Sequence, residues 1–311
     1  MTIQPIEHAQ LIGYKDLFDT FVSLYKKQKL PNKIILSGRR GIGKSTFAYH
    51  FINYVFSIDE DFKYNLENFQ INELNNSFNK VKSNLHPNFF LIDMDEEKKS
   101  IEVEKIRKLI TYSQKQSFDN KIRFVLINNI EFLNLNAANA LLKILEEPND
   151  NLFFILIHDD SKKILDTIKS RCIIFKKAFD LNETISIVNE VIKDDIYNYL
   201  NNDFIDNYST VGELVHLFHF SNENKINLKE NSLKNFIQIL IDDKNFNKNK
   251  ELLVLVFDLL EKYFYKNFLN TKNIDIYKLY KKFSKKKYIT DKYNLDMGTL
   301  LLEIRSEVLS A

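Results

Sequence analysis

The sequence is poor in cysteine, glycine and proline, and it has no tryptophan. Its one cysteine, Cys172, excludes an internal disulfide and a cysteine-rich zinc site. The interior has to be filled by other side chains, and we expect the 15 tyrosines and 26 phenylalanines to do most of this. No apolar run approaches the ~18 residues of a membrane span, and the N-terminal MTIQPIEHAQ lacks the pattern of a secretion signal. We therefore expect a cytoplasmic protein.

An excess of one charge is also missing. The 44 lysines and arginines nearly balance the 42 acidic residues, which leaves a formal net charge of +2. No global field therefore draws the molecule to nucleic acid, and any contact with DNA has to come from a local patch. The segment YKKFSKKKY (280–288) is either such a patch or a solvated basic face of a helix.

Short apolar runs alternate with helical patterns over the first 177 residues. The runs that we interpret as buried strands are 33–37, 88–92, 122–127, 152–157 and 172–177. The segments with helical spacing are 14–30, 44–56, 101–116, 136–146 and 161–169. This alternation predicts an α/β fold, in which a parallel sheet is covered by helices on both faces.

The strand pattern ends after residue 177. Asp180 and Glu183 in the segment DLNE have the spacing of a capping box, which predicts the start of a helix. Only helical patterns follow, and the polar stretch 221–231 is the best candidate for a linker. We therefore expect an α/β domain over 1–177 and two all-α domains over 178–225 and 226–311.

A phosphate-binding motif lies between the first predicted strand and the helix after it. Residues 38–45 match the pattern GxxxxGK[ST] of a P-loop, and three of the chain's six glycines fall in this stretch. An ordinary glycine turn is the alternative, but a complete match at this position counts against it. The predicted nucleotide contacts are Gly38, Arg39, Arg40, Gly41, Ile42, Gly43, Lys44, Ser45 and Thr46.

The chemistry of this motif defines the expected ligand. In a P-loop, backbone N–H groups and a helix N-terminus hold the phosphates. Lys44 would bridge the β- and γ-phosphates, and Ser45 would bind Mg²⁺. The motif therefore predicts ATP or ADP with Mg²⁺ as the ligand.

The strand 122–127 ends on Asn128 and Asn129, where P-loop ATPases usually place acidic residues. Hydrolysis needs one carboxylate beside Mg²⁺ and a second one that polarises water, and an asparagine carries no charge and accepts no proton. Loss of a general base alone costs about 10²–10⁴ in rate. Glu131 is the nearest acid, but it follows the strand end at a distance that makes it poorly placed. We therefore expect little or no intrinsic hydrolysis.

Two further segments give the sequence a specific resemblance. NAANALLKILEEP (136–148) and TIKSRC (167–172), taken in order with the P-loop, resemble the clamp-loader branch of the AAA+ ATPases. The match is best with the delta-prime family of bacterial DNA polymerase III, and it is extended by LPNKIILSGRRGIGKST (30–46), HPNFFLID (86–93), IEVEKIRKLI (101–110) and YNLDMGTLLLEI (293–304). The resemblance implies a AAA+ core over 1–177, a helical lid over 178–225 and a collar over 226–311 that joins subunits into a ring.

The resemblance also implies roles for single residues. Arg171 of the Ser170-Arg171-Cys172 motif would project into the ATP site of a neighbouring subunit and act there in trans, although its position alone would also fit an ordinary surface arginine. In the lid, Glu213 stands near the place where clamp-loader ATPases carry an arginine. Many members have a four-cysteine zinc module, but residues 57–85 contain no cysteine, so we expect no zinc.

Three functions remain possible at this point. The first is a largely non-hydrolysing, delta-prime-like ring subunit that donates Arg171 during sliding-clamp loading in DNA replication. Its partners would be gamma/tau-like and delta-like subunits and, through the complex, the sliding clamp and primed DNA. The second is an active gamma/tau-type ATPase. Acidic residues at positions 128 and 129 would favour it, but this sequence has asparagines there. The third is a stand-alone P-loop kinase or nucleotide sensor, which would need neither Arg171 nor a collar.

Overall fold

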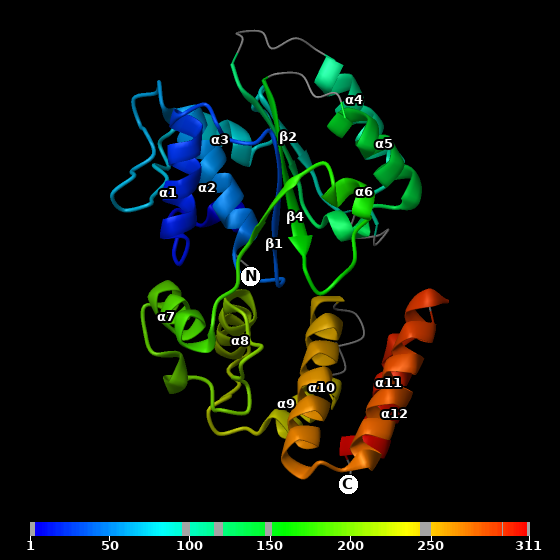
Figure 1. Ribbon diagram of the computed structural model, residues 1–311. Coiled ribbons are helices and arrows are strands. Elements are labelled where there is room, and N and C mark those ends of the chain that lie inside the picture. Colours follow the sequence, from blue (N-terminus) through cyan, green and yellow to red (C-terminus); the bar gives the residue numbers. More distant parts are fainter. Residues whose placement is uncertain are drawn as a thin grey trace. The chain divides into compact units, whose positions relative to one another are not determined.

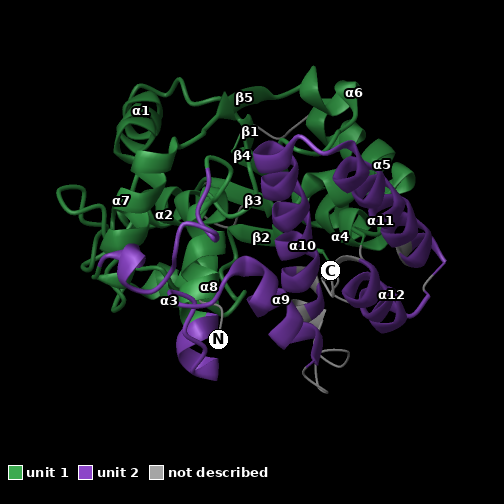
Figure 2. Ribbon diagram, turned by 90° about the horizontal axis from the view of Figure 1, so that it is seen from below, with its two compact units in different colours: residues 1–194, 207–219 green, residues 195–206, 220–311 purple. Residues whose placement is uncertain are grey.

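The computed structural model describes residues 4–94, 100–114, 121–146, 151–242, 250–293 and 295–309. Glu147 and Pro148, which close the segment NAANALLKILEEP and end its helix in the sequence pattern, lie outside these ranges. The chain forms two compact units, of which the first comprises Met1–Asp194 and Asn207–His219 and the second Asp195–Asp206 and Phe220–Ala311 (Figure 2). The three domains expected from the sequence, with boundaries after 177 and 225, stay a prediction.

A five-stranded sheet forms the centre of the first unit. Its strands are β1 (Lys33–Gly38), β2 (Phe89–Ile92), β3 (Arg123–Ile127), β4 (Leu152–Asp159) and β5 (Ile173–Lys176). They pair in the order β2-β3-β4-β1-β5, and every pairing is parallel. The predicted strands and the α/β class are thereby confirmed.

Helices cover both faces of this sheet (Figure 1). The helices on one face are α1 (Lys15–Lys26), α2 (Lys44–Ser57) and α3 (Asn76–Lys82), and those on the other are α4 (Val103–Gln114), α5 (Leu135–Glu146) and α6 (Asp166–Lys169). Neighbouring strand residues belong to different core clusters: Leu126 packs with α1 and α2, and Val125 with α4 and α5. This alternation is the two-residue period of a strand that is buried on both faces.

The helix predicted over 161–169 is wrong in its first half, because only Asp166–Lys169 is helical. Upstream of it, the Asp159 carboxylate accepts hydrogen bonds from the backbone N–H and the hydroxyl of Ser161. The backbone N–H of Lys162 donates to the Asp159 carbonyl oxygen. These local bonds form a turn that competes with a helical start.

The segment after α2 is folded onto the same core. It contains α3, which the sequence did not predict, and it buries Tyr64, Ile71 and Phe78. The Glu60 carboxylate accepts hydrogen bonds from the Asn75 amide and from the hydroxyl and backbone N–H of Ser77. A hydrogen-bonded carboxylate therefore organises this cysteine-free insertion.

Aromatic side chains fill the core beneath α1 and α2. The ring of Phe18 is completely buried, and it stacks on Tyr64 at 5.1 Å between centroids. Edge-to-face contacts surround it, with Phe47 at 6.0 Å and Phe51 at 6.3 Å. The expectation that phenylalanine and tyrosine would do the work of core filling is confirmed for this cluster.

The remaining helices follow the sheet in the sequence. The first unit continues with α7 (Leu181–Ile192), whose predicted capping box is confirmed because Asp180 and Glu183 exchange side chain-to-backbone hydrogen bonds. Further elements are the turns η1 (Pro5–Glu7), η2 (Ile130–Phe132) and η3 (Ile196–Asn198), and α8 (Val211–Asn224), along which the division between the units falls. Because α8 extends to Asn224, part of the expected linker 221–231 is helical.

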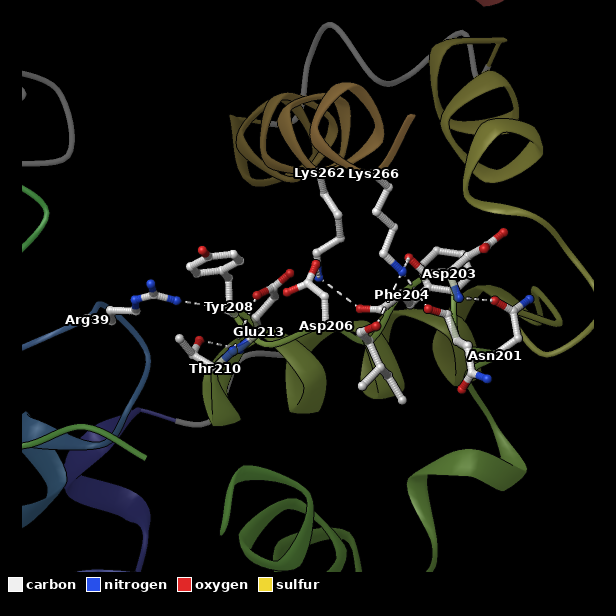
Figure 3. A network of polar contacts seen from close by, with 12 residues as sticks. Arg39, Asn201, Asp203, Phe204, Asp206, Tyr208, Thr210, Glu213, Lys262 and Lys266 are labelled. Atoms are coloured by element: carbon white, nitrogen blue, oxygen red, sulfur yellow. Dashed lines mark hydrogen bonds and ion pairs between the residues drawn. The ribbon is translucent and has the colours of Figure 1, made fainter. Parts of the chain in front are cut away.

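The second unit is helical in all its regular elements that the structure describes. These are η3, the end of α8, α9 (Leu233–Asp242), α10 (Lys250–Thr271), α11 (Ile274–Lys292), α12 (Met297–Ile304) and a π-helical turn over Arg305–Leu309. Lys262 of α10 donates to the Phe204 carbonyl oxygen at 2.8 Å, and Lys266 donates to the Asp203 carbonyl oxygen (Figure 3). These bonds fix the segment 201–206 to α10. Within the described ranges, no helix combines the length and the apolar character that crossing a bilayer requires.

Asn75 connects the insertion to α2 and to the Glu60 carboxylate, and we expect Asn75→Ala to lower the free energy of unfolding by about 2–4 kcal/mol. Its side chain caps α3 by accepting from the Phe78 backbone N–H, and it also binds Asn53 and Glu60. Chemical denaturation measures the effect. The exposed Asn76 is the matched control, and Asn76→Ala should change stability by less than about 0.5 kcal/mol. Equal losses in both variants would contradict this role.

Candidate functional site

The P-loop connects the carboxyl end of β1 to the start of α2. Gly43 has φ of 92°, a left-handed conformation that a residue with a side chain adopts only under strain, and α2 begins directly after it at Lys44. The strand–loop–helix context predicted for the motif is therefore present. The N-terminus of a 14-residue helix faces the loop, which gives it the partial positive charge that phosphate binding uses.

Lys44 is almost fully buried beneath this loop. Its ammonium group donates to the Gly38 carbonyl oxygen at 2.7 Å and to the Arg39 carbonyl oxygen at 2.6 Å. Burial lowers the pKa of Lys44 to about 8, and the nearby charges of Asp159 and Glu131 oppose this shift. The cation is thus placed inside the loop, where a phosphate group could replace the two carbonyl partners.

Tyr14 supports the loop from beneath, a role that no sequence motif indicated. Its hydroxyl donates to the Ile42 carbonyl oxygen at 2.9 Å, and its ring lies 5.2 Å from that of Phe47 in α2. Tyr14 is only 3% exposed, and burial raises the pKa of its hydroxyl. The phenol therefore stays protonated and remains a hydrogen-bond donor to the loop.

The tip of the loop contacts the start of α8 inside the first unit. The backbone N–H of Gly212 donates to the Gly41 carbonyl oxygen at 2.7 Å. A Cβ at Gly212 would lie 2.9 Å from the Gly41 Cα, so a side chain at position 212 would push the two backbones apart. Arg39 extends the contact: it donates to the Tyr208 carbonyl oxygen at 3.1 Å, with its guanidinium 4.6 Å from the Tyr208 ring centroid (Figure 3).

Glu213 has a local role that sequence reasoning missed. Its carboxylate accepts from the Thr210 backbone N–H, and its own backbone N–H donates to the Thr210 hydroxyl, both at 3.4 Å. This is the capping-box arrangement at the start of α8. The spacing of Thr210 and Glu213 in TVGE is the signal that could have identified it.

Asn128 and Asn129 follow β3 as predicted, and Asn128 lies beside Ser45. The Ser45 hydroxyl donates to the Asn128 Oδ1 at 3.1 Å. The Nδ2 groups of both asparagines are turned the other way and donate to Asp93, at 2.9 Å from Asn128 and 3.3 Å from Asn129. The site therefore includes a carboxylate, but it stands at the end of β2.

Sequence reasoning missed Asp93 because it examined only the strand that usually carries the acids. The signal was present, since Asp93 directly follows the predicted strand 88–92. Carboxyl ends of neighbouring parallel strands meet at one edge of a sheet, and Ile92 stands opposite Ile127 in the register of β2 and β3. Residues 93 and 128 are consequently adjacent.

Glu131 is closer to the site than the sequence suggested. Its Oε2 accepts from the backbone N–H of Asp159 at 3.2 Å, so the side chain reaches the carboxyl end of β4. Its charge also acts on Lys44. Glu131 is thereby used as a hydrogen-bond acceptor for the backbone at the end of β4.

The chemistry of these groups fits a nucleotide with Mg²⁺. The helix N-terminus, the left-handed glycines at 41 and 43 and the Lys44 ammonium suit a phosphate chain. Ser45 with Asn128 suits the metal side, because Mg²⁺ prefers oxygen ligands. In the described ranges, no three His, Cys, Asp or Glu side chains form a metal-ligand set of their own. In nucleotide sites Mg²⁺ is generally held by few protein groups together with phosphate oxygens.

Arg171 lies at the surface, between α6 and the edge strand β5. Its Nη1 donates to the Thr167 carbonyl oxygen at 2.9 Å, and its Nη2 pairs with the Glu146 carboxylate at 2.5 Å. The side chain remains 32% exposed, and Ile173, two residues further on, is 53% exposed. The guanidinium is therefore held against the outside of its own domain and is not part of its core.

Comparison with known proteins gives one consistent result. The family model described as DNA polymerase III, delta subunit, matches residues 13–179, which is more than half of the chain. A delta' subunit of DNA polymerase III from Pseudomonas aeruginosa is 39% identical over 88 residues, which are 28% of this chain and 27% of that protein. The delta' subunit from Bacillus subtilis is 28% identical over 147 residues, which are 47% and 42% of the two chains.

Gamma subunits are similar as well. A DNA polymerase III gamma subunit from Buchnera aphidicola is 27% identical over 197 residues, which are 63% of this chain and 49% of that protein. The chain thus spans about half or less of the length of these relatives. Among solved structures, a gamma subunit-related protein from Thermotoga maritima aligns over 84% of this chain and 76% of its own, at 17% identity and a TM-score of 0.38.

The buried lysine predicts a specific dependence of stability on pH. A lysine with a pKa of about 8 in the folded state and 10.5 in the unfolded state binds fewer protons when folded, so its contribution to stability rises with pH between these values. The difference in unfolding free energy between the native chain and Lys44→Met should therefore rise by about 2 kcal/mol from pH 8 to pH 10. Urea denaturation at each pH measures it.

The exposed Lys26 of α1 provides the control for this measurement. The same difference taken with Lys26→Met should stay flat over the range. A flat profile for Lys44→Met as well would contradict the burial of a charged amine beneath the P-loop.

Proposed function

Because this chain belongs to the DNA polymerase III delta subunit family, we propose that it is a delta-prime-like ring subunit of a clamp loader. In this role it hydrolyses little or no ATP itself and donates Arg171 to the ATP site of a neighbouring subunit. The observation that carries the proposal is the pairing of a complete P-loop with two neutral amides, Asn128 and Asn129, at the strand end beside Ser45.

The amides determine what the site can do with a nucleotide. Asn129 accepts no proton, so it cannot act as a general base toward an attacking water. Loss of a general base typically lowers the rate of hydrolysis by a factor of about 10²–10⁴. Glu131, the next acid along the chain, is already bonded to the Asp159 backbone. Nucleotide is therefore held at the P-loop without being cleaved.

The surroundings of Arg171 support a role in trans. A guanidinium fixed beside a transferring phosphoryl group stabilises charge on its oxygens, a contribution of roughly 10³–10⁵ in rate in GTPases. The pair with Glu146 is partly exposed, and such surface pairs contribute only about 0–1 kcal/mol. A neighbour's triphosphate, with several negative charges, competes well against one carboxylate. The Glu146 pair keeps the arginine ordered until that competitor arrives.

The partners follow from the same assignment. They are gamma/tau-like and delta-like subunits, with the sliding clamp and primed DNA reached through the assembled ring in the cytoplasm. In this arrangement residues 1–177 form the AAA+ core, 178–225 the lid and 226–311 the collar. An active gamma/tau-type ATPase is the competing function, since gamma subunits are also among the relatives.

We expect Arg171→Ala to lower ATP turnover at the neighbouring site by about 10³-fold when the variant is assembled with its partner subunits. Turnover of the whole ring then falls by that site's share, which a steady-state phosphate-release assay on the reconstituted complex measures. The control is Arg107→Ala, because Arg107 is also a surface arginine paired with a carboxylate, that of Glu104.

Two outcomes of this experiment decide the proposal. Loss of turnover in Arg171→Ala with an intact ring, checked by gel filtration, supports donation in trans. Unchanged turnover in an equally intact ring would remove Arg171 from the chemistry and contradict donation in trans, whereas robust ATP hydrolysis by the isolated chain, abolished by Lys44→Ala, would favour the competing ATPase function.

A further inference from the structure

The carboxylate of Asp93 stands at the end of β2, beside the two asparagines that follow β3. Its Oδ2 accepts from Asn128, and its Oδ1 accepts from Asn129 and from the backbone N–H of Met94, the last at 2.7 Å. The backbone is tied down as well, since Lys105 of α4 donates to the Asp93 carbonyl oxygen at 2.6 Å. Asp93 is therefore a fixed charge and does not swing freely at the sheet edge.

This charge sets the orientation of the amide beside Ser45. An ionised carboxylate only accepts hydrogen bonds, so it binds the NH₂ end of an asparagine and never its oxygen. Asp93 thereby turns the Asn128 Nδ2 toward β2 and the Asn128 Oδ1 toward the Ser45 hydroxyl. An amide without such a partner could present either end to Ser45.

The negative charge of Asp93 also acts on Tyr49 of α2. Tyr49 stands one helical turn after Ser45, and its hydroxyl is buried there. Burial is the main cause of its raised pKa, and the negative charge of Asp93 adds to the shift. The carboxylate therefore acts across the gap between the sheet edge and the start of α2.

We propose that Asp93 supplies from β2 the negative charge that Asn128 lacks, and that the Asp93–Asn128 pair supports Mg²⁺ at Ser45 when a nucleotide is bound. The carboxylate polarises and orients the amide, whose oxygen faces the metal side of the P-loop. The inference rests on the proposed function only in that the P-loop takes a nucleotide; it requires neither the ring nor Arg171.

The geometry also separates metal support from hydrolysis. Both oxygens of Asp93 already accept hydrogen bonds from the two asparagines. The carboxylate bonded in this way holds its charge at the two amides and reaches the metal side of the P-loop by way of the Asn128 oxygen. The site is thus built to bind a magnesium nucleotide and to leave it intact.

Binding of a fluorescent ADP analogue to the isolated full chain tests this inference, with titrations in Mg²⁺ and in EDTA. In the native chain Mg²⁺ should tighten binding, and Asp93→Asn should reduce that enhancement by about 10- to 100-fold, the usual effect of losing an outer partner of a metal ligand. Affinity in EDTA should stay unchanged, because the phosphate contacts remain. Asp19→Asn, which removes an exposed carboxylate of α1, should behave like the native chain.

Moving the carboxylate from position 93 to position 128 distinguishes loss of the charge from structural damage by the substitution. The double variant Asp93→Asn with Asn128→Asp returns one carboxylate to the pair on the other strand, and it should restore the Mg²⁺ enhancement. If Asp93→Asn alone does not fold, as judged by circular dichroism, the double variant and Asp93→Glu carry the test, since both keep the charge.

Each remaining outcome overturns the inference. These outcomes are a native chain that binds the analogue equally well in Mg²⁺ and EDTA or not at all, a folded Asp93→Asn that keeps the full enhancement, and a folded double variant that lacks it. None of these results affects the role proposed for Arg171, which is measured on the reconstituted ring.

Discussion

The parallel register of β1 to β4 is the constraint on which the site depends. Because all four strands run in the same direction, their carboxyl ends lie at one edge of the sheet. The P-loop leaves β1 there, Asn128 leaves β3 and Asp93 leaves β2. Three segments that are far apart in the sequence thereby form one chain of hydrogen bonds, from the Ser45 hydroxyl through the Asn128 amide to the Asp93 carboxylate.

The features that were predicted correctly from the sequence are those that a local pattern of residues determines. The five strands are buried on both faces and read as short apolar runs, and the capping box at Asp180 and Glu183 involves residues of a single turn. What the sequence did not predict depends on packing between distant segments. Tyr14 shows this for the P-loop, because its bond to Ile42 exists only once α1 has packed on α2. Asp93 also depends on packing between distant segments, because it contacts Asn128 at the end of the neighbouring strand. This contact could be deduced only from the order of the strands in the sheet.

A second group of contacts holds the P-loop to the start of α8. The bond between Gly212 and Gly41 and the contact of Arg39 with Tyr208 fix the loop tip with no phosphate taking part. Asn128 and Asn129 place neutral amides at the end of β3, while Arg171 stands outside the core in a partly exposed pair with Glu146. In the function that we propose, the molecule separates two tasks that an ATPase combines: its own site binds nucleotide, and its exposed cation acts on the nucleotide of a neighbour.

The central claim is that the P-loop of this chain holds a triphosphate without breaking it. The most direct measurement is a single-turnover experiment, in which the isolated protein in excess is incubated with Mg²⁺ and γ-labelled ATP, quenched with acid at intervals and assayed for free phosphate. We predict that the bound nucleotide remains ATP over hours, at the rate of the protein-free control. Phosphate release well above that control, abolished by Lys44→Ala, would contradict the account.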